Sequence, residues 1–160
     1  MKYLIELSVN GETHEVAVEA QVTILEVLRG QLGLTGAKEA CGSGECGSCT
    51  ILMDGKPILS CLTLALDCPG HEITTIEGLS KVDGLSPLQQ SFQDCGAIQC
   101  GFCTPGMVLT AGSLLEENPQ PSEEEIKKAL EGNLCRCTGY NKIVEAVKLA
   151  AERAASKGGG

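Results

Sequence analysis

Large aromatic side chains are almost absent from this sequence, which has two Phe, two Tyr and no Trp among its 160 residues. Hydrophobic residues still make up 42% of the chain, so a folded core is expected rather than disorder. Cores without large aromatics are thin, and small domains of that kind usually need a disulfide or a metal to stabilise them. Ten cysteines are available for that purpose.

Clustered positive charge is also missing. The formal net charge is −9 at pH 7, and Lys and Arg are only loosely scattered in the last expected helix. Because binding to a phosphate backbone requires a basic patch, a nucleic-acid partner is not expected. No stretch approaches the roughly 18 apolar residues of a membrane span, so no membrane span is expected either.

The N-terminus carries no recognisable export signal. Residues 1–9 already alternate in polarity as a strand does, and they contain neither an apolar signal core nor a twin-arginine pair. The sequence therefore favours the cytoplasm, where thiols stay reduced and where ten cysteines indicate metal before disulfides. The alternative is a secreted disulfide-rich protein, which would need the missing signal.

The first part of the chain shows mainly strand signals. Residues 3–9 alternate in polarity and lead into Asn10-Gly11, a dipeptide that favours a type I′ hairpin turn because both positions need positive φ. Residues 14–18 are expected to return as the second strand of this hairpin.

A short helix and further strands follow the hairpin. Thr23 and Glu26 form a capping box for a helix that is expected to end near Gly33. Further strands are expected at residues 50–53, 58–60 and 72–76. A hairpin, a crossing helix and more strands together predict a compact α+β domain over residues 1–78.

Residues 79–160 show helix signals instead. Helix starts are indicated by an N-cap followed by proline or by a capping box, and helix ends by Gly or by Pro. In chain order these signals are Ser86-Pro87, Thr104-Pro105, Asn118-Pro119, Ser122 with Glu125, and Gly132. A last helix is predicted by apolar residues at helical spacing, namely Ile143, Val144, Val147 and Ala151. Four short helices predict a small bundle.

Four cysteines of the first domain have the spacing C-x4-C-x2-C-x11-C, which is that of plant-type 2Fe–2S ferredoxins. They are Cys41, Cys46, Cys49 and Cys61. Gly42, Gly44 and Gly47 lie among them, and glycine lets the backbone approach sulfur closely and point its N–H groups at it. A four-cysteine zinc site would use two C-x2-C pairs, and only one occurs here, so this quartet predicts a 2Fe–2S cluster.

The second quartet combines a C-x2-C pair with a C-x-C pair and consists of Cys100, Cys103, Cys135 and Cys137. Each pair precedes an expected helix start, so two helix N-termini would point toward the anionic thiolates, which the helix dipole favours. Spacing alone leaves a single zinc ion open here, because zinc also accepts four thiolates.

Three stretches of the sequence resemble the iron–sulfur subunit of the xanthine dehydrogenase family of molybdenum hydroxylases. They are CGSGECGSC at residues 41–49, QCGFCTPG at residues 99–106 and GNLCRCTGY at residues 132–140. The family includes aldehyde oxidoreductases, aerobic carbon monoxide dehydrogenase and 4-hydroxybenzoyl-CoA reductase. The similarity extends over nearly the whole chain, with the motifs in the same order and spacing.

The resemblance implies a ferredoxin-like β-grasp domain over residues 1–78 and a four-helix bundle over residues 79–160, each with one 2Fe–2S cluster. It implies an electron-transfer subunit of a multi-subunit molybdenum-dependent oxidoreductase, without a substrate site of its own. Gln99 and Cys137 match residues that contact molybdopterin, expected as the cytosine dinucleotide, on a large partner subunit. The N-terminal cluster is expected to pass electrons to FAD on a medium subunit or to an external acceptor.

Two other classes of function are alternatives. One is a free-standing two-cluster ferredoxin, against which the resemblance of the C-x-C loop to a pterin docking surface argues. The other is a zinc-stabilised binding module with no redox role, which would be colourless.

Four further residues are interpreted as structural. Cys68 and Cys95 lie outside both quartets and are expected to be small buried hydrophobic side chains. His14 and His71 do not neighbour either quartet in sequence, which argues against a Rieske centre with two His ligands.

Overall fold

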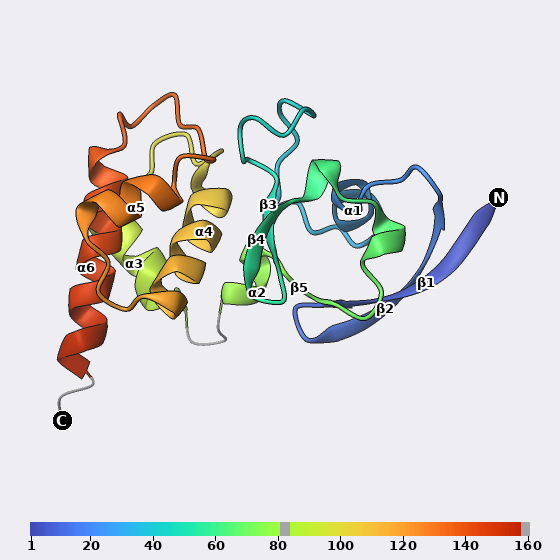
Figure 1. The fold of residues 1–160 in the computed structure, drawn as a ribbon, viewed down its shortest axis with the longest axis horizontal. Helices are drawn as coiled ribbons and strands as arrows, with labels where there is room; N and C mark the ends of the chain where they lie inside the picture. Colours follow the sequence, from blue (N-terminus) through green and yellow to red (C-terminus); the bar gives the residue numbers. More distant parts are fainter. Residues whose placement is uncertain (81–83, 158–160) are drawn as a thin grey trace.

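The computed structural model describes residues 1–80 and 84–157 of the chain. A five-stranded mixed sheet with short helical turns forms one half of the molecule, and a group of longer helices forms the other (Figure 1). The α+β class predicted from the sequence is therefore confirmed. Residues 81–83, close to the expected domain boundary, and residues 158–160 lie outside the described part.

The first two strands form the predicted hairpin. Strands β1 (Lys2–Val9) and β2 (Glu12–Glu19) pair antiparallel along their whole length. Asn10 and Gly11 have φ of 55° and 79°, the positive values that a type I′ turn requires. Because side chains alternate between the two faces of a strand, one face supplies the core. Its buried residues are Leu7, Val9, Val16 and Val18.

A short helical segment packs against the buried face of the hairpin. Helix α1 (Ile24–Glu26) continues directly into the π-helical turn η1 (Val27–Gln31), a conformation that the sequence did not predict. The predicted capping box is present, since the Thr23 hydroxyl accepts from the Glu26 amide at 3.3 Å and the Glu26 carboxylate accepts from the Thr23 amide at 2.7 Å. The buried side chains of this segment are Ile24, Leu25, Val27 and Leu28.

Three more strands complete the sheet in the order β2-β1-β5-β3-β4. They are β3 (Thr50–Met53), β4 (Lys56–Leu59) and β5 (Glu72–Thr74), with β5 parallel to β1 and antiparallel to β3. Ile51 of β3 faces the core of the sheet half, whereas helix α4 (Thr104–Glu117) packs against β3 and β4 from the helical half. The sheet and the helices are therefore in direct contact.

The last strand is shorter than the predicted span of residues 72–76, because Ile76 begins the short helix α2 (Ile76–Leu79). The side chain of Asn10 takes the place of a neighbouring strand at this point. Its Oδ1 accepts from the Thr75 amide, and its amide nitrogen donates to the Thr75 hydroxyl, both at 2.9 Å. With its N–H satisfied in this way, Thr75 leaves the sheet while remaining fully buried.

Four helices surround a second hydrophobic core. Besides α4 they are α3 (Pro87–Asp94), α5 (Glu123–Ala129) and α6 (Asn141–Lys157). Ser86 caps α3 as predicted, with a reciprocal capping box to Gln89. The largest buried side chains of this core are Phe92, Met107, Ile126 and Ile143.

Two of the predicted helix signals act differently in the structure. Thr104 is the first residue of α4 rather than its N-cap, and the cap position is occupied by Cys103, whose side chain makes no capping hydrogen bond. Gly132 lies beyond the end of α5, which ends at Ala129 with Leu130 as its C-cap. The start of α4 therefore places its first amides directly beside a cysteine.

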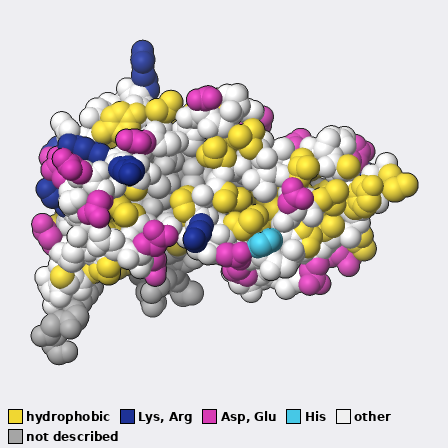
Figure 2. Space-filling model, in the orientation of Figure 1, with side chains coloured by type: hydrophobic (Ala, Val, Ile, Leu, Met, Phe, Trp, Pro, Cys, Tyr) yellow, Lys and Arg dark blue, Asp and Glu magenta, His cyan; other side chains and the backbone are white. Residues whose placement is uncertain are grey.

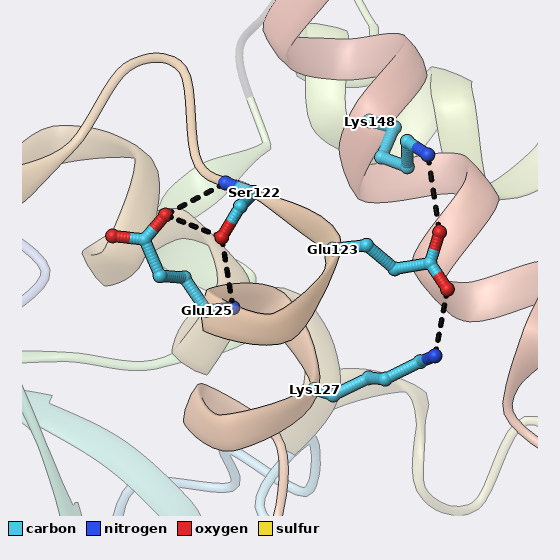
Figure 3. Close-up of polar contacts among 5 residues, drawn as sticks. All are labelled: Ser122, Glu123, Glu125, Lys127 and Lys148. Carbon is cyan, nitrogen blue, oxygen red and sulfur yellow. Dashed lines mark hydrogen bonds and ion pairs between the residues drawn. The ribbon is translucent and has the colours of Figure 1, made fainter.

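Helix α5 is attached to α6 through Glu123 (Figure 3). The Glu123 carboxylate lies 2.6 Å from Lys127 Nζ in its own helix and 3.2 Å from Lys148 Nζ in α6. These two hydrogen-bonded ammonium groups hold the pKa of Glu123 below its usual range. Ser122 caps the same helix and forms the predicted capping box with Glu125.

Charged and apolar side chains are distributed unevenly over the face drawn in Figure 2. Lys and Arg side chains gather mostly over the helical half, whereas hydrophobic side chains extend across the sheet half toward the N-terminus. In the parts of the chain that the structure describes, no helix combines the length and apolar character needed to cross a membrane.

The two cysteine regions lie at the same end of the molecule. The loop of residues 41–49 and the two helical loops that contain the other quartet are all found in the upper part of Figure 1. The backbone amide of Leu134 donates to the carbonyl of Cys46 at 2.9 Å. Loops from different halves of the chain are therefore bonded directly to each other.

Candidate metal centres

The first quartet gathers around one glycine-rich loop. Cys41, Cys46 and Cys49 lie in this loop, while Cys61 comes from the short turn η2 (Ser60–Leu62) that follows β4. The thiols contact each other in two pairs, Cys41 with Cys46 and Cys49 with Cys61. Cys41 is exposed and Cys49 is buried, so the site has an open side and a closed side.

Backbone N–H groups point at the sulfur atoms of this quartet, as the glycine pattern predicts. The amides of Ser43 and Cys46 bond to Cys41 and lower the pKa of its thiol to about 6. The amide of Gly44 bonds to Cys61, but burial prevails there and raises the pKa of Cys61 to about 11. The loop can take this path because its glycines adopt positive φ. The values are 62° at Gly42, 82° at Gly44 and 70° at Gly47.

The helical half assembles its quartet from two loops. Cys100 and Cys103 precede α4, and Cys135 and Cys137 precede α6. The Sγ atoms of Cys100 and Cys137 are 3.5 Å apart, and Cys103 contacts Cys135. Cys100 and Cys137 are exposed, whereas the other two thiols are partly buried.

Side chains as well as backbone groups surround the sulfurs of the second quartet. Burial raises the pKa of Cys103 to about 12. Burial also opposes ionisation of Cys135, but the hydroxyl and amide of Thr138 and the amide of Cys137 outweigh it, so the pKa of Cys135 is lowered. Thr138 Oγ1 donates to Cys135 Sγ at 3.1 Å, and the Tyr140 hydroxyl accepts from the Cys135 amide at 2.9 Å.

Both cysteine pairs of the second quartet lie close to a helix N-terminus. Helix α4 begins immediately after Cys103, and α6 begins at Asn141, shortly after Cys137. The dipole of each helix favours negative charge at its N-terminal end. The start of each helix therefore suits a bound anionic thiolate group, as the sequence predicts.

The pairwise contacts of the thiols suit a two-iron cluster. Within the described residues, no three His, Cys, Asp or Glu side chains gather closely enough to share one metal ion. Each quartet instead presents two thiol pairs, and a 2Fe–2S cluster takes two protein ligands on each of its two irons. The residues present therefore fit a 2Fe–2S cluster in each half.

Gln99 and Cys137 are both exposed. Gln99 is adjacent in sequence to Cys100, whose Sγ lies 3.5 Å from that of Cys137, and these two exposed thiols form one edge of the site. Large apolar side chains are exposed around this edge. They are Ile98, Phe102, Leu134 and Tyr140.

The residues interpreted as structural lie outside both quartets. Cys68 is fully buried, its thiol bonds to the Leu64 carbonyl at 3.4 Å, and burial raises its pKa to about 11. Cys95 is partly buried at the end of α3. His71 lies 2.6 Å from Asp54, and its hydrogen bond holds the pKa of that carboxyl below its usual range.

Asn133 is a candidate that the sequence interpretation missed. It is 4% exposed, and its side chain bonds to groups from both halves of the chain. Its partners are 23 to 86 positions away, so no local pattern could predict them. The only sequence signal is its place in the third cysteine motif, just before Leu134 and Cys135.

Comparison with known protein families assigns each half of the chain separately. Residues 7–68 match the family described as the 2Fe–2S iron–sulfur cluster binding domain, and residues 75–148 match the family described as the 2Fe–2S binding domain. Together these matches cover most of the chain and confirm that it has two cluster-binding domains.

Individual relatives match over nearly the whole chain. The small FeS subunit of nicotinate dehydrogenase from Eubacterium barkeri is 48% identical over 155 residues, which cover 97% of this chain and 99% of that protein. A probable xanthine dehydrogenase subunit of Bacillus subtilis is 48% identical over 138 residues, or 86% of this chain and 79% of that one. The crystal structure of quinoline 2-oxidoreductase from Pseudomonas putida 86 matches with a TM-score of 0.93 and 48% identity, covering 97% of both chains.

These similarities identify the class of protein that the two cysteine sites indicate, a small iron–sulfur subunit made of two cluster-binding domains. The chain belongs to the xanthine dehydrogenase family of molybdenum hydroxylases, as the electron-transfer subunit of a multi-subunit oxidoreductase.

Proposed function

We propose that this chain carries electrons, one at a time, from a molybdopterin centre on a large partner subunit to FAD on a medium subunit or to an external acceptor. A 2Fe–2S cluster in each half supplies the redox chemistry. The observation that carries the proposal is the direct bond between the two cysteine loops, from the Leu134 amide to the Cys46 carbonyl. This contact brings the two sites together at one end of the molecule.

The proposed ligands are the thiolates of the two quartets. They are Cys41, Cys46, Cys49 and Cys61 in the sheet half, and Cys100, Cys103, Cys135 and Cys137 in the helical half. Their pairwise contacts and the N–H groups directed at sulfur support this assignment. Donors directed at sulfur stabilise the negative charge that a cluster gains on reduction.

The helical site is proposed to face the molybdopterin, expected in the cytosine dinucleotide form. Gln99 and Cys137 are both exposed, and they belong to the two loops whose cysteines, Cys100 and Cys137, are in contact. The side-chain amide of Gln99 and the backbone of Cys137 are therefore both available to the pterin. The exposed Phe102 and Tyr140 suit a subunit interface, where aromatic residues are enriched. A hetero-oligomer with a large subunit would cover these side chains.

The sheet site is proposed to face the outer acceptor. Cys41 is exposed, and Leu62 and Leu64 are exposed apolar side chains beside Cys61. A medium subunit or an external protein could therefore approach this quartet without touching the helical site.

The finer domain description is part of the same proposal. A β-grasp domain over residues 1–78 and a four-helix bundle over residues 79–160 are supported by the two separate hydrophobic cores. Helix α2 joins them, because Ile76 and Leu79 pack against the second core. A cytoplasmic location is proposed on the ten free thiols.

The order of electron transfer can be tested in the native complex with ligand variants. Cys46→Ser should remove only the cluster of the sheet half. Substrate should then still reduce the cluster of the helical half, while turnover with the external acceptor collapses. Nicotinate and quinoline, named in the relatives, are the first substrates to try.

The reciprocal variant, Cys103→Ser, should block the path at its start. Substrate should no longer reduce the sheet-half cluster, although dithionite still does. Reduction of that cluster by substrate at the normal rate in Cys103→Ser would overturn the proposed order. A chain that migrates alone on size-exclusion chromatography of the native extract would favour the free-standing ferredoxin instead.

Gln99→Ala provides a milder test of the same order. Both clusters should remain bound, because Gln99 is not among the thiolate ligands. Reduction by substrate should nevertheless slow, since the pterin loses a contact at the exposed edge of the helical site. An unchanged rate would remove Gln99 from the proposed interface.

A further inference from the structure

Asn133 forms the centre of the junction between the two cysteine loops. Its Oδ1 accepts from Thr110 Oγ1 in α4 at 2.9 Å. Its Nδ2 donates to the Gly47 carbonyl at 3.1 Å and to Thr50 Oγ1 at 3.2 Å, both in the sheet half. One buried amide therefore joins a helix, a cluster loop and a strand through three hydrogen bonds.

The chain around Asn133 is packed so closely that two glycines are required. A Cβ placed on Gly47 would lie 2.1 Å from the Gly132 carbonyl oxygen. A Cβ on Gly106, in the first turn of α4, would lie 2.5 Å from the Gly47 carbonyl oxygen and 2.9 Å from Asn133 Nδ2. A side chain at either position would therefore require a shift of backbone.

The junction is attached directly to a proposed ligand on each side. Gly47 follows Cys46 in the sheet half, and only Leu134 separates Asn133 from Cys135 in the helical half. The Leu134 amide also bonds to the Cys46 carbonyl at 2.9 Å. Asn133 therefore bonds to the neighbour of one proposed ligand, Cys46, and lies two positions before another, Cys135.

We propose that Asn133 is a positioning residue that fixes the two cysteine loops against each other and so sets the separation and relative orientation of the two bound clusters. The inference rests on the proposed function, because it requires that both quartets hold a cluster. It assigns to Asn133 a role that thiolate ligation does not supply, since each quartet lies within one half of the chain.

A second contact between the halves serves as a matched control. Ser113 Oγ in α4 donates to the Gly55 carbonyl in the β3–β4 turn at 2.9 Å. Ser113→Ala removes a hydrogen bond between the halves but does not touch a cysteine loop. If these bonds only held the two halves together, Ser113→Ala and a variant at Asn133 should have the same effect. If Asn133 positions the cysteine loops, only the variant at Asn133 should change the geometry of the two clusters.

The decisive variant is Asn133→Asp, which keeps the shape of the side chain. A carboxylate has no N–H to donate, and its oxygen would face the Gly47 carbonyl oxygen, so the loops should separate. Thr110→Val is the second variant, because it leaves Asn133 in place and removes only the hydrogen bond that orients its amide. If Asn133→Asp fails to retain both clusters, Thr110→Val is the variant on which the test is made.

The measurement is electron paramagnetic resonance of the dithionite-reduced holoenzyme, in which both clusters are paramagnetic. Magnetic coupling between them depends steeply on their separation and orientation. The parent and Ser113→Ala should show the same resolved splitting. Asn133→Asp should lose that splitting while keeping both cluster signals, and Thr110→Val should broaden it.

Unchanged splitting in a variant at Asn133 or Thr110 that retains both clusters, or an equal loss in Ser113→Ala, would overturn the positioning role. A parent enzyme that shows only one cluster signal after full reduction would overturn the two-cluster function itself.

Discussion

The two cysteine sites gather four thiols and direct hydrogen-bond donors at sulfur in different ways. In the sheet half, three cysteines lie in one loop, and chiefly backbone amides, from Ser43 and Cys46, point at sulfur. In the helical half, two distant loops each contribute a pair, and the hydroxyls of Thr138 and Tyr140 bond to Cys135. One site thus depends mainly on the path of the backbone, and the other on helix starts and side chains.

This difference determines which substitutions should matter. Backbone donors cannot be removed by changing a side chain, so the sheet site is sensitive mainly at the glycines that shape its loop. The helical site has a side-chain donor to sulfur, the Thr138 hydroxyl, that a single substitution deletes. Three sets of variants test the comparison, beginning with the one that has the largest expected effect.

The largest effect is expected when one ligand of either site is replaced. Cys46→Ser and Cys103→Ser should each lose about half of the iron and sulfide. Cluster binding contributes to the stability of small domains, so each variant should also loosen its own half, as structural zinc sites show. Metal analysis and hydrogen exchange should give complementary losses in the two variants. If either variant kept both clusters, the assignment of that ligand would be wrong.

A smaller effect is expected from the glycines of the sheet-half loop. Gly42 and Gly47 both have positive φ, which costs a non-glycine residue about 1 kcal/mol. A Cβ on Gly42 meets nothing within 4 Å, whereas one on Gly47 lies 2.1 Å from the Gly132 carbonyl oxygen. Gly42→Ala should therefore lower the free energy of unfolding by about 1 kcal/mol, and Gly47→Ala by at least about 2 kcal/mol.

The stabilities of both glycine variants can be compared by denaturant unfolding, with the cluster absorbance as the signal. Gly47→Ala should lose absorbance at a lower denaturant concentration than Gly42→Ala. Equal midpoints would show that the junction with the helical half does not constrain this loop.

The smallest effect is expected on the reduction potential of the helical-half cluster. Thr138→Val removes the hydroxyl that donates to Cys135 Sγ. A hydrogen bond that stabilises the reduced cluster by about 1 kcal/mol more than the oxidised one corresponds to roughly 40 mV for a one-electron couple, so the potential should fall by at most about that amount. Thr138→Ser should retain the parent value. In the sheet half, Ser43→Ala should shift the other cluster less, because the Ser43 amide contributes more than its hydroxyl.

The sequence predicts local structure well where one or two adjacent residues determine it. Asn10-Gly11 marks the hairpin turn, and Ser86 and Ser122 begin the helices expected of them. The strand predicted at residues 72–76 is present but ends at Thr74, where the Asn10 side chain, far away in sequence, bonds to the next residue, Thr75.

In the candidate sites, too, the sequence predicts what nearby residues determine and misses what depends on distant ones. Cysteine spacing and glycine content predict the two quartets, since three motifs contain nearly all of these thiols. The residues around them that depend on folding were not predicted. Asn133 bonds to Gly47 across 86 positions, and only the packing of the two halves brings these residues together.

Two 2Fe–2S clusters held by two cysteine quartets should be evident in the metal and sulfide content of the purified native protein. We expect about four irons and about four acid-labile sulfides per chain, with a reddish-brown colour and no zinc. Stoichiometric zinc, or only about two irons in well-folded protein, would contradict this expectation.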